Sequence, residues 1–124
     1  MENIESLKLV YITLIFLTFL HSIEEVIGKA TFINTFYGNL VNYWLIHFLV
    51  FFVLIILFLF TLNDKKWYYS LNYFYAITMI IDGAYHIIAG ITGGYTGIGL
   101  IIFGSLLIYL LWKNQKSPKL RKLL

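Results

Sequence analysis

The chain contains no cysteine, a single proline and few charged residues. The absence of cysteine excludes a disulfide framework and any metal site built on thiolates. The single proline, Pro118, leaves the apolar stretches of the sequence unbroken by proline kinks. Only 12% of the 124 residues are charged and 60% are hydrophobic. Soluble domains carry about 25% charged residues, so this composition excludes an ordinary soluble protein.

Four apolar stretches take up most of the sequence and predict an all-α fold. A helix of about 20 apolar residues crosses a bilayer core, and each stretch is close to that length. The stretches are Leu7–Ile27, Tyr43–Leu62, Tyr68–Ala89 and Tyr95–Trp112. We therefore expect an integral membrane four-helix bundle that forms one domain, residues 1–124. The segment between the first two stretches mixes aromatic residues with asparagines and is expected to lie at the membrane interface.

The basic residues predict the orientation of this bundle. Eight of the nine lysines and arginines lie near the N-terminus, between the second and third stretches, or in a basic tail, residues 113–124. Lys29 alone falls on the other side. Because cytoplasmic loops carry an excess of basic residues, both termini are expected in the cytoplasm, with the protein in the cell membrane as a multi-pass protein. The tail is expected to bind anionic headgroups of the lipid bilayer and not nucleic acid.

Ionisable residues interrupt the apolar stretches near their predicted outer ends. They are costly in hydrocarbon unless they are paired, and they usually mark a functional site. At about 1.5 Å of rise per residue, all of them fall within about 11 Å of the outer ends of their helices. Spacings of three and four residues place those of the first stretch on one helix face and those of the third on another. We therefore expect one shared site, made of His21, Glu24, Glu25, His47, Asp82 and His86.

Imidazole and carboxylate groups in this number suit one or two transition-metal ions, such as iron or zinc. The expected metal ligands are all six residues, and the expected catalytic residues are His21, Glu24, Glu25 and His86. Acid–base catalysis without a metal is equally allowed, because a glutamate in a low-dielectric slot can exchange protons with a histidine. Since the site lies in the outer half of the bilayer, the expected substrate is lipid-like or small and apolar.

Residues 21–25 read HSIEE, and this motif resembles that of the HXXEE-domain family of small membrane proteins. The family pattern adds a second histidine and a YxPG element near the last span. His86 matches the second histidine, and Tyr95 begins YTGIG, with Gly97 and Ile98 in place of the family's proline and glycine. The family is of unknown function and is suspected to be enzymatic. The resemblance therefore implies a site in these residues and names no reaction.

Two further functions stay open. The same residues can serve as a relay in a proton- or cation-coupled transporter, since intramembrane carboxylates and histidines often do so. Against transport, the ionisable residues gather in one outer slab, and the chain has no inverted repeat. The residues can also fix helix packing alone, in a non-catalytic membrane subunit or receptor. Each of these functions is compatible with a homo-oligomer.

Overall fold

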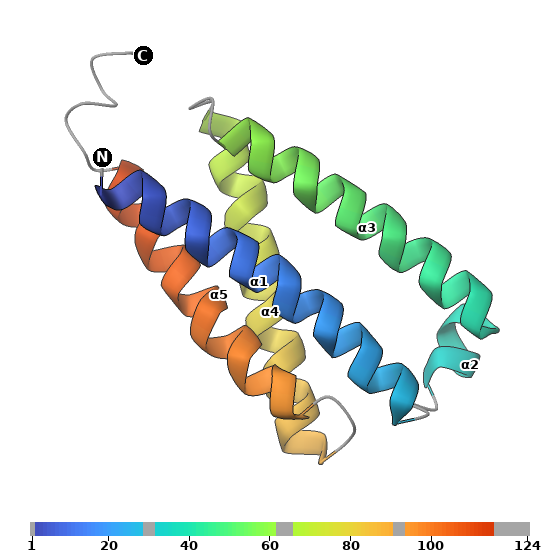
Figure 1. The fold of residues 1–124 in the computed structure, drawn as a ribbon. Coiled ribbons are helices and arrows are strands. Elements are labelled where there is room, and N and C mark those ends of the chain that lie inside the picture. The colour runs from blue at the N-terminus through green and yellow to red at the C-terminus, as the bar shows by residue number, and fades with distance from the viewer. Residues whose placement is uncertain (1, 29–31, 62–65, 91–93, 116–124) are drawn as a thin grey trace.

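The computed structural model describes residues 2–28, 32–61, 66–90 and 94–115, which form five helices and no strand. The all-α class is therefore confirmed (Figure 1). Each predicted span lies in a long helix, although the first helix starts earlier than expected. Most of the basic tail, residues 113–124, lies outside the described residues. The helices are α1 (Glu2–Ile27), α2 (Phe32–Tyr37), α3 (Leu40–Thr61), α4 (Lys66–Ala89) and α5 (Gly94–Gln115).

Three of the described helices are long and apolar enough to cross a membrane. They are the segments Glu5–Ile27 of α1, Leu40–Phe60 of α3 and Gly94–Gln115 of α5. The sequence predicted four such helices. The helix that differs is α4, which has 24 residues but carries polar side chains along its length.

Two polar side chains of α4 are buried in the protein, and several of its large apolar side chains face outward. Asn72 and His86 are buried, whereas Phe74, Ile81 and Ile88 are exposed. The Tyr11 hydroxyl donates a hydrogen bond of 2.7 Å to Oδ1 of Asn72, which links α4 to α1. This arrangement is the reverse of a water-soluble protein, in which apolar side chains are buried and polar ones are exposed.

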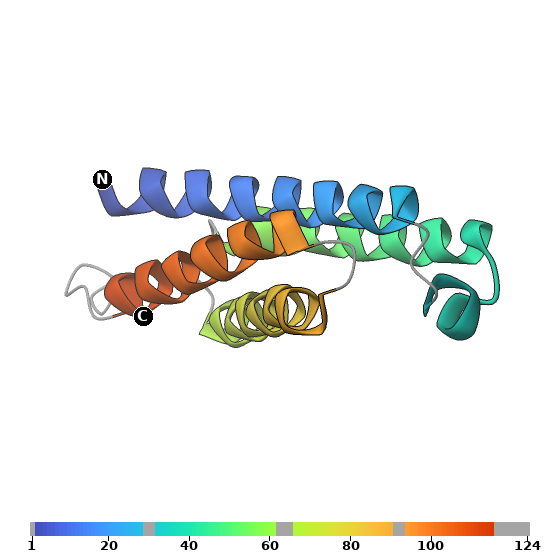
Figure 2. The same cartoon turned by 90° about the horizontal axis from the view of Figure 1, so that it is seen from below.

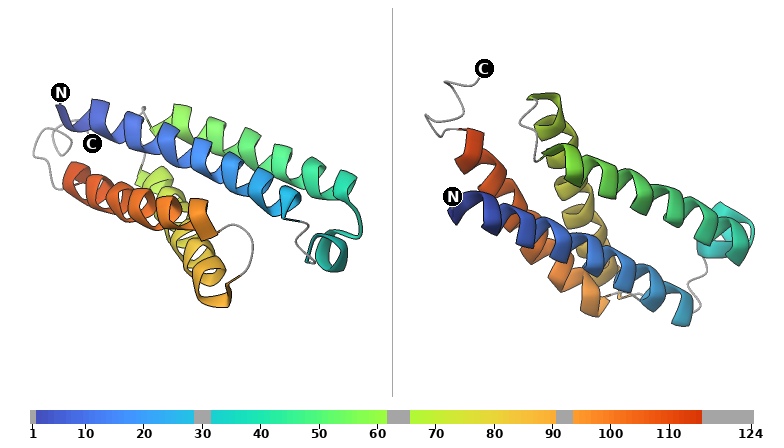
Figure 3. Two further views of the ribbon diagram at one scale, coloured as in Figure 1. Left: turned by 60° about the horizontal axis from the view of Figure 1, so that its bottom comes forward. Right: turned by 45° about the horizontal axis from the view of Figure 1, so that its top comes forward.

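Three helices, α1, α4 and α5, pack around the buried core (Figures 1 and 2). The core side chains include Tyr11 and Leu14 of α1 and Leu100, Leu107 and Leu111 of α5. The start of α1 lies beside the end of α5, at the end of the molecule away from α2 (Figure 3).

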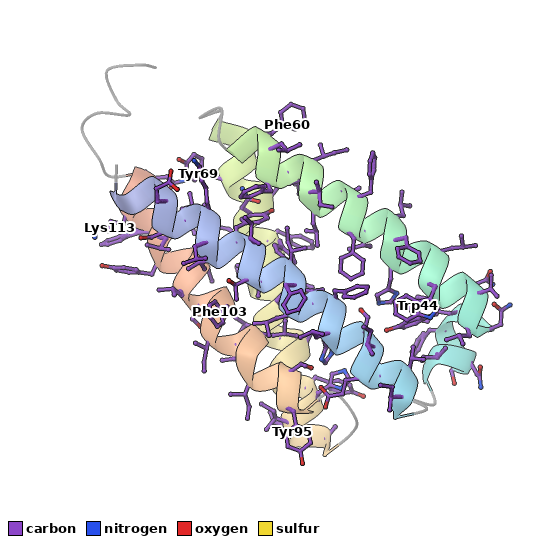
Figure 4. All side chains as sticks on the ribbon, viewed as in Figure 1. Trp44, Phe60, Tyr69, Tyr95, Phe103 and Lys113 are labelled. Atoms are coloured by element: carbon purple, nitrogen blue, oxygen red, sulfur yellow. The ribbon has the colours of Figure 1, made fainter. Side chains whose placement is uncertain are left out.

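The remaining long helix, α3, runs beside α1 and diverges from α4 toward the end that carries α2 (Figures 1 and 3). Aromatic side chains fill part of the space between α1 and α3. The ring of Trp44 lies 6.4 Å from that of Phe19 of α1 (Figure 4). The outer face of α3 is apolar and open, with Leu45, Leu49 and Phe52 each about 60% exposed.

Glycines allow α4 and α5 to cross in close contact. A Cβ atom added at Gly83 would overlap the carbonyl oxygen of Gly97, and one added at Gly97 would lie 2.9 Å from the carbonyl oxygen of Gly83. Gly104 packs in the same way against Ala76 and Ile80 of α4. The residues that precede Gly83 and Gly97, Asp82 of α4 and Thr96 of α5, both belong to the site described below.

Candidate metal centre

Two pairs of ionisable residues meet where α1 and α4 end. His21 and Glu25 lie one turn apart near the end of α1, and Asp82 and His86 lie one turn apart near the end of α4. Because residues four apart share a face of a helix, each pair projects as a unit toward the other helix. The sequence predicted this meeting of the first and third spans, and the geometry agrees.

The closest contact joins Nε2 of His86 to Oε1 of Glu25, at 3.0 Å. The Nε2 atom of His21 lies 3.4 Å from the same carboxylate oxygen and 3.2 Å from Oδ2 of Asp82. The two imidazole rings meet edge to face, with centroids 4.5 Å apart. His21, Glu25 and His86 thus each offer one ligand atom, all within 4.8 Å of one another.

These three side chains are removed from solvent, with exposed fractions of 3% for His21, 5% for Glu25 and 2% for His86. Asp82 is more open, with 36% of its side chain exposed. Nε2 of His21 makes no aligned hydrogen bond, although two carboxylates lie nearby. Buried charges are costly unless they are paired or bind a metal, so the two carboxylates require a positive charge at this point.

The second carboxylate oxygen of Glu25 is held by Tyr43 of α3. The phenol of Tyr43 is fully buried and donates a hydrogen bond of 2.6 Å to Oε2 of Glu25. This short contact is typical of a hydrogen bond to an ionised acceptor. Tyr43 therefore fixes the orientation of Glu25 and leaves Oε1 directed at the two histidines.

Glu24 does not point into this group. Its Oε2 atom accepts hydrogen bonds from the hydroxyl of Thr96, at 2.7 Å, and from the backbone N–H of Thr96, at 3.1 Å. The same hydroxyl lies 2.7 Å from Nδ1 of His21. Glu24 was predicted as a metal ligand and catalytic residue, but its carboxylate faces α5 and reaches the centre only through Thr96 and His21.

His47 lies near the centre without joining it. Its Nδ1 atom donates to the backbone carbonyl of Tyr43, at 2.8 Å, and its ring stacks on that of Tyr43 with centroids 3.9 Å apart. The predicted ligand role of His47 thus has no support from the packing of its ring. The histidine instead supports Tyr43, which in turn holds Glu25.

An open cavity of about 790 Å³ lies between α1, α2, α3 and α4, and the centre forms part of its wall. Ligand pockets typically have volumes of about 300–1,000 Å³. One side of the cavity is polar and belongs to α1 and α4. The other side is mostly apolar and comes from α3, which contributes Ile46, His47, Val50 and Phe51.

The short helix α2 covers one end of this cavity with Phe36 and Tyr37. The Tyr37 ring contacts the rings of Tyr43 and His47, with centroids 5.1 and 5.7 Å away. Burial raises the pKa of the Tyr37 phenol above its usual value, and the carboxylates of Glu25 and Asp82 raise it further. Because Tyr37 lines the same cavity as Glu25 and Asp82, α2 lies close to the charged centre.

Two residues of this arrangement, Thr96 and Tyr43, were not among those predicted. Tyr43 could have been found from its spacing, because it lies four residues before His47 and shares its helix face. Thr96 follows Tyr95 in the YTGIG segment, but only the packing of α5 against α1 brings it to His21. Comparison of the chain with protein-family models, with curated proteins and with solved structures finds no match. The resemblance to the HXXEE-domain family thus stays a prediction from the motif.

Proposed function

We propose that this chain is a small membrane enzyme with a metal centre formed by His21, Glu25 and His86, with Asp82 beside them. The proposed substrate is lipid-like and enters the cavity from the bilayer. One observation carries the proposal: three buried ligand atoms converge within 4.8 Å of one another. The imidazole and carboxylate set suits zinc or iron.

The proposed placement has α1, α3, α4 and α5 crossing the cell membrane as a four-helix bundle, with both termini cytoplasmic. For α4 the support is its outward apolar face, since Phe74, Ile81 and Ile88 would meet lipid. Its polar residues find partners inside the protein, as intramembrane polar groups must. The eight-to-one distribution of basic residues supports the orientation.

A metal ion accounts for the position of the His21 Nε2 atom. This atom is buried and lies within 3.4 Å of two carboxylate groups, yet it forms an aligned hydrogen bond with neither. A buried imidazole nitrogen that faces two carboxylates without an aligned hydrogen bond to either is an arrangement that a bound cation would complete. A divalent ion there would also neutralise Glu25 and Asp82 and could polarise a substrate carbonyl or activate water.

The shape of the cavity supports a lipid-like substrate. Its volume suits an amphiphile, and its polar and apolar walls come from different helices. A polar group of the substrate would meet His86 and Glu25, while an apolar chain would lie along Ile46 and Val50 of α3. Because α3 diverges from α4, the apolar chain of the substrate could enter the cavity from the bilayer between these two helices.

Metal analysis combined with a search for turnover tests this function. The purified protein in lipid nanodiscs should contain close to one zinc or iron ion per chain, and His86→Gln should lose it. Incubation with a native lipid extract, followed by mass spectrometry, should reveal a product that the His86→Gln protein does not form. A wild-type protein with no metal, before and after incubation with Zn²⁺ and Fe²⁺, would contradict the proposal.

A proton-coupled transporter is the second candidate, and one observation favours it. Polar contacts continue from the centre along the α1–α4 interface, where the hydroxyls of Thr18 and Tyr75 lie 2.9 Å apart and Tyr11 binds Asn72. These groups are uncharged, and such contacts also join membrane helices in proteins that transport nothing. Proton flux into proteoliposomes that depends on Glu25 would favour transport over the enzyme.

A further inference from the structure

The hydroxyl of Thr96 connects two ionisable residues of α1. Its oxygen lies 2.7 Å from Oε2 of Glu24 and 2.7 Å from Nδ1 of His21. A hydroxyl has one hydrogen to donate and can accept through its lone pairs. The protonation of His21 therefore depends on which of the two neighbours receives that hydrogen.

Glu24 is the acceptor. An ionised carboxylate can only accept hydrogen bonds, and the same Oε2 atom also accepts one from the backbone N–H of Thr96. With its hydrogen donated to Glu24, the Thr96 hydroxyl must accept from His21. The Nδ1 atom of His21 therefore carries a hydrogen.

The opposite ring nitrogen of His21 is then free to bind a metal. In a neutral imidazole only one nitrogen carries a hydrogen, so the Nε2 atom of this tautomer bears a lone pair. That atom faces Glu25 and Asp82 at 3.4 and 3.2 Å. Metal-binding histidines usually donate their other N–H group to a nearby acceptor, which fixes the tautomer and the ring orientation.

We propose that Thr96 and Glu24 are positioning residues that hold His21 as its Nδ1–H tautomer and direct its Nε2 lone pair into the centre. This inference rests on the proposed function and assigns a role to the glutamate of the HSIEE motif that is not a proposed ligand. The glutamate to which it assigns this role, Glu24, is the first of the two in HSIEE, and Glu25 is the second. The inference also gives α5 a part in the site, because Thr96 belongs to α5 while the ligands come from α1 and α4.

The test combines a spectroscopic signature with metal affinity. Nitrogen-15 spectra of histidine-labelled protein distinguish the two tautomers, and His47→Gln and His86→Gln assign the signals of the three histidines. At a pH where His21 is neutral, the wild type should show the Nδ1–H tautomer. Thr96→Val removes the hydroxyl but keeps the shape of the side chain, so His21 should no longer be held as the Nδ1–H tautomer. Thr96→Ser keeps the hydroxyl and should retain this tautomer.

Affinity for Zn²⁺ alone, measured by calorimetry, should follow the same order. Loss of such a supporting contact typically weakens metal binding by about 10–100-fold, so we expect this for Thr96→Val and recovery for Thr96→Ser. Thr78→Val is the matched control, because Thr78 lines the cavity but its hydroxyl donates to the carbonyl of Phe74 in its own helix. Thr78→Val should leave the His21 tautomer and the Zn²⁺ affinity unchanged.

The outcomes separate the two proposals. An Nε2–H tautomer of His21 in the wild type would overturn the positioning role, whatever the protein does with metal. Equal Zn²⁺ affinity of the wild type and Thr96→Val would overturn it as well. Absence of Zn²⁺ binding in a wild type that shows the Nδ1–H tautomer would instead contradict the metal centre.

Discussion

The Nε2 atom of His86 on α4 lies 3.0 Å from Oε1 of Glu25 on α1. This contact joins two helices that are separated in the sequence by α2 and α3, and both side chains are almost fully buried. Removing one partner of such a pair leaves a buried, uncompensated group, at a cost of about 3–5 kcal/mol when the pair is charged. The contact is therefore a structural link between α1 and α4 as well as the core of the proposed centre.

Gly83→Ala should destabilise the crossing of α4 and α5. The added methyl group would overlap the backbone of Gly97, which cannot move without separating the helices. Overpacking of this kind costs about 1–3 kcal/mol, so the melting temperature in detergent should fall. Gly99→Ala is the control, because its methyl group would meet only the flexible side chain of Leu17, at 3.1 Å. Equal melting temperatures of the two variants would show that α4 and α5 do not meet at Gly83.

Tyr43→Phe should weaken the centre without emptying the space between the helices. It removes the hydroxyl that donates to Glu25 at 2.6 Å, and a hydrogen bond to a charged group contributes about 1.5–3 kcal/mol. Tyr11→Phe is the matched control, since it removes a buried tyrosine hydroxyl that binds Asn72 instead. Both variants should have a lower melting temperature than the wild type, but only Tyr43→Phe should bind Zn²⁺ more weakly. If both variants keep the wild-type affinity, Tyr43 does not orient a ligand.

Val50→Trp should block the cavity and reduce lipid entry. Val50 lines the apolar wall of the cavity, so a larger side chain there would take the space of an acyl chain. Labelling by a photoactivatable phospholipid, with the modified residues located by mass spectrometry, should fall several-fold at Met79 and Tyr85. Leu49→Trp is the control, because Leu49 is 63% exposed on the outer face of α3. Unchanged labelling of Val50→Trp would argue against lipid in the cavity.

Labelling of single cysteines should reveal the topology. The chain has no cysteine of its own, so Asn34→Cys in α2 and Gln115→Cys at the end of α5 each introduce one thiol. In intact cells, a membrane-impermeant maleimide should modify Asn34→Cys, and it should reach Gln115→Cys only after permeabilisation. The reverse pattern would overturn the cytoplasmic placement of the termini.

Much of the helical structure could be predicted from the sequence, because the apolar stretches follow from hydropathy alone, although several helices start before the predicted stretches. The meeting of His21 with His86 also followed, since shared depth and helical periodicity limit where such residues can lie. By hydropathy alone, α4 is not among the described helices that are apolar enough to cross a membrane. Its polar residues are satisfied by α1, and this compensation is a property of packing that composition does not record.

The different contacts of Glu24 and Glu25 could not be predicted from the sequence. Successive residues of a helix point about 100° apart, so the two glutamates face different neighbours. Which neighbour each one meets depends on the packing of α5 against α1, which brings Thr96 to Glu24, and on the position of Tyr43 beside Glu25. The isolation of His47 has a similar origin, because stacking on Tyr43 holds its ring away from the other histidines.

Titration with Co²⁺, followed by visible absorption, tests the central claim that His21, Glu25 and His86 bind a metal ion. The wild type should bind one ion per chain, with ligand-field bands of imidazole and carboxylate coordination. Glu25→Gln should lose the bands, because the amide keeps the shape but lacks the charge. Glu5→Gln, which removes an exposed carboxylate paired with Lys8, should behave as the wild type. Identical titrations of Glu25→Gln and the wild type, or no bands in either, would contradict the metal centre.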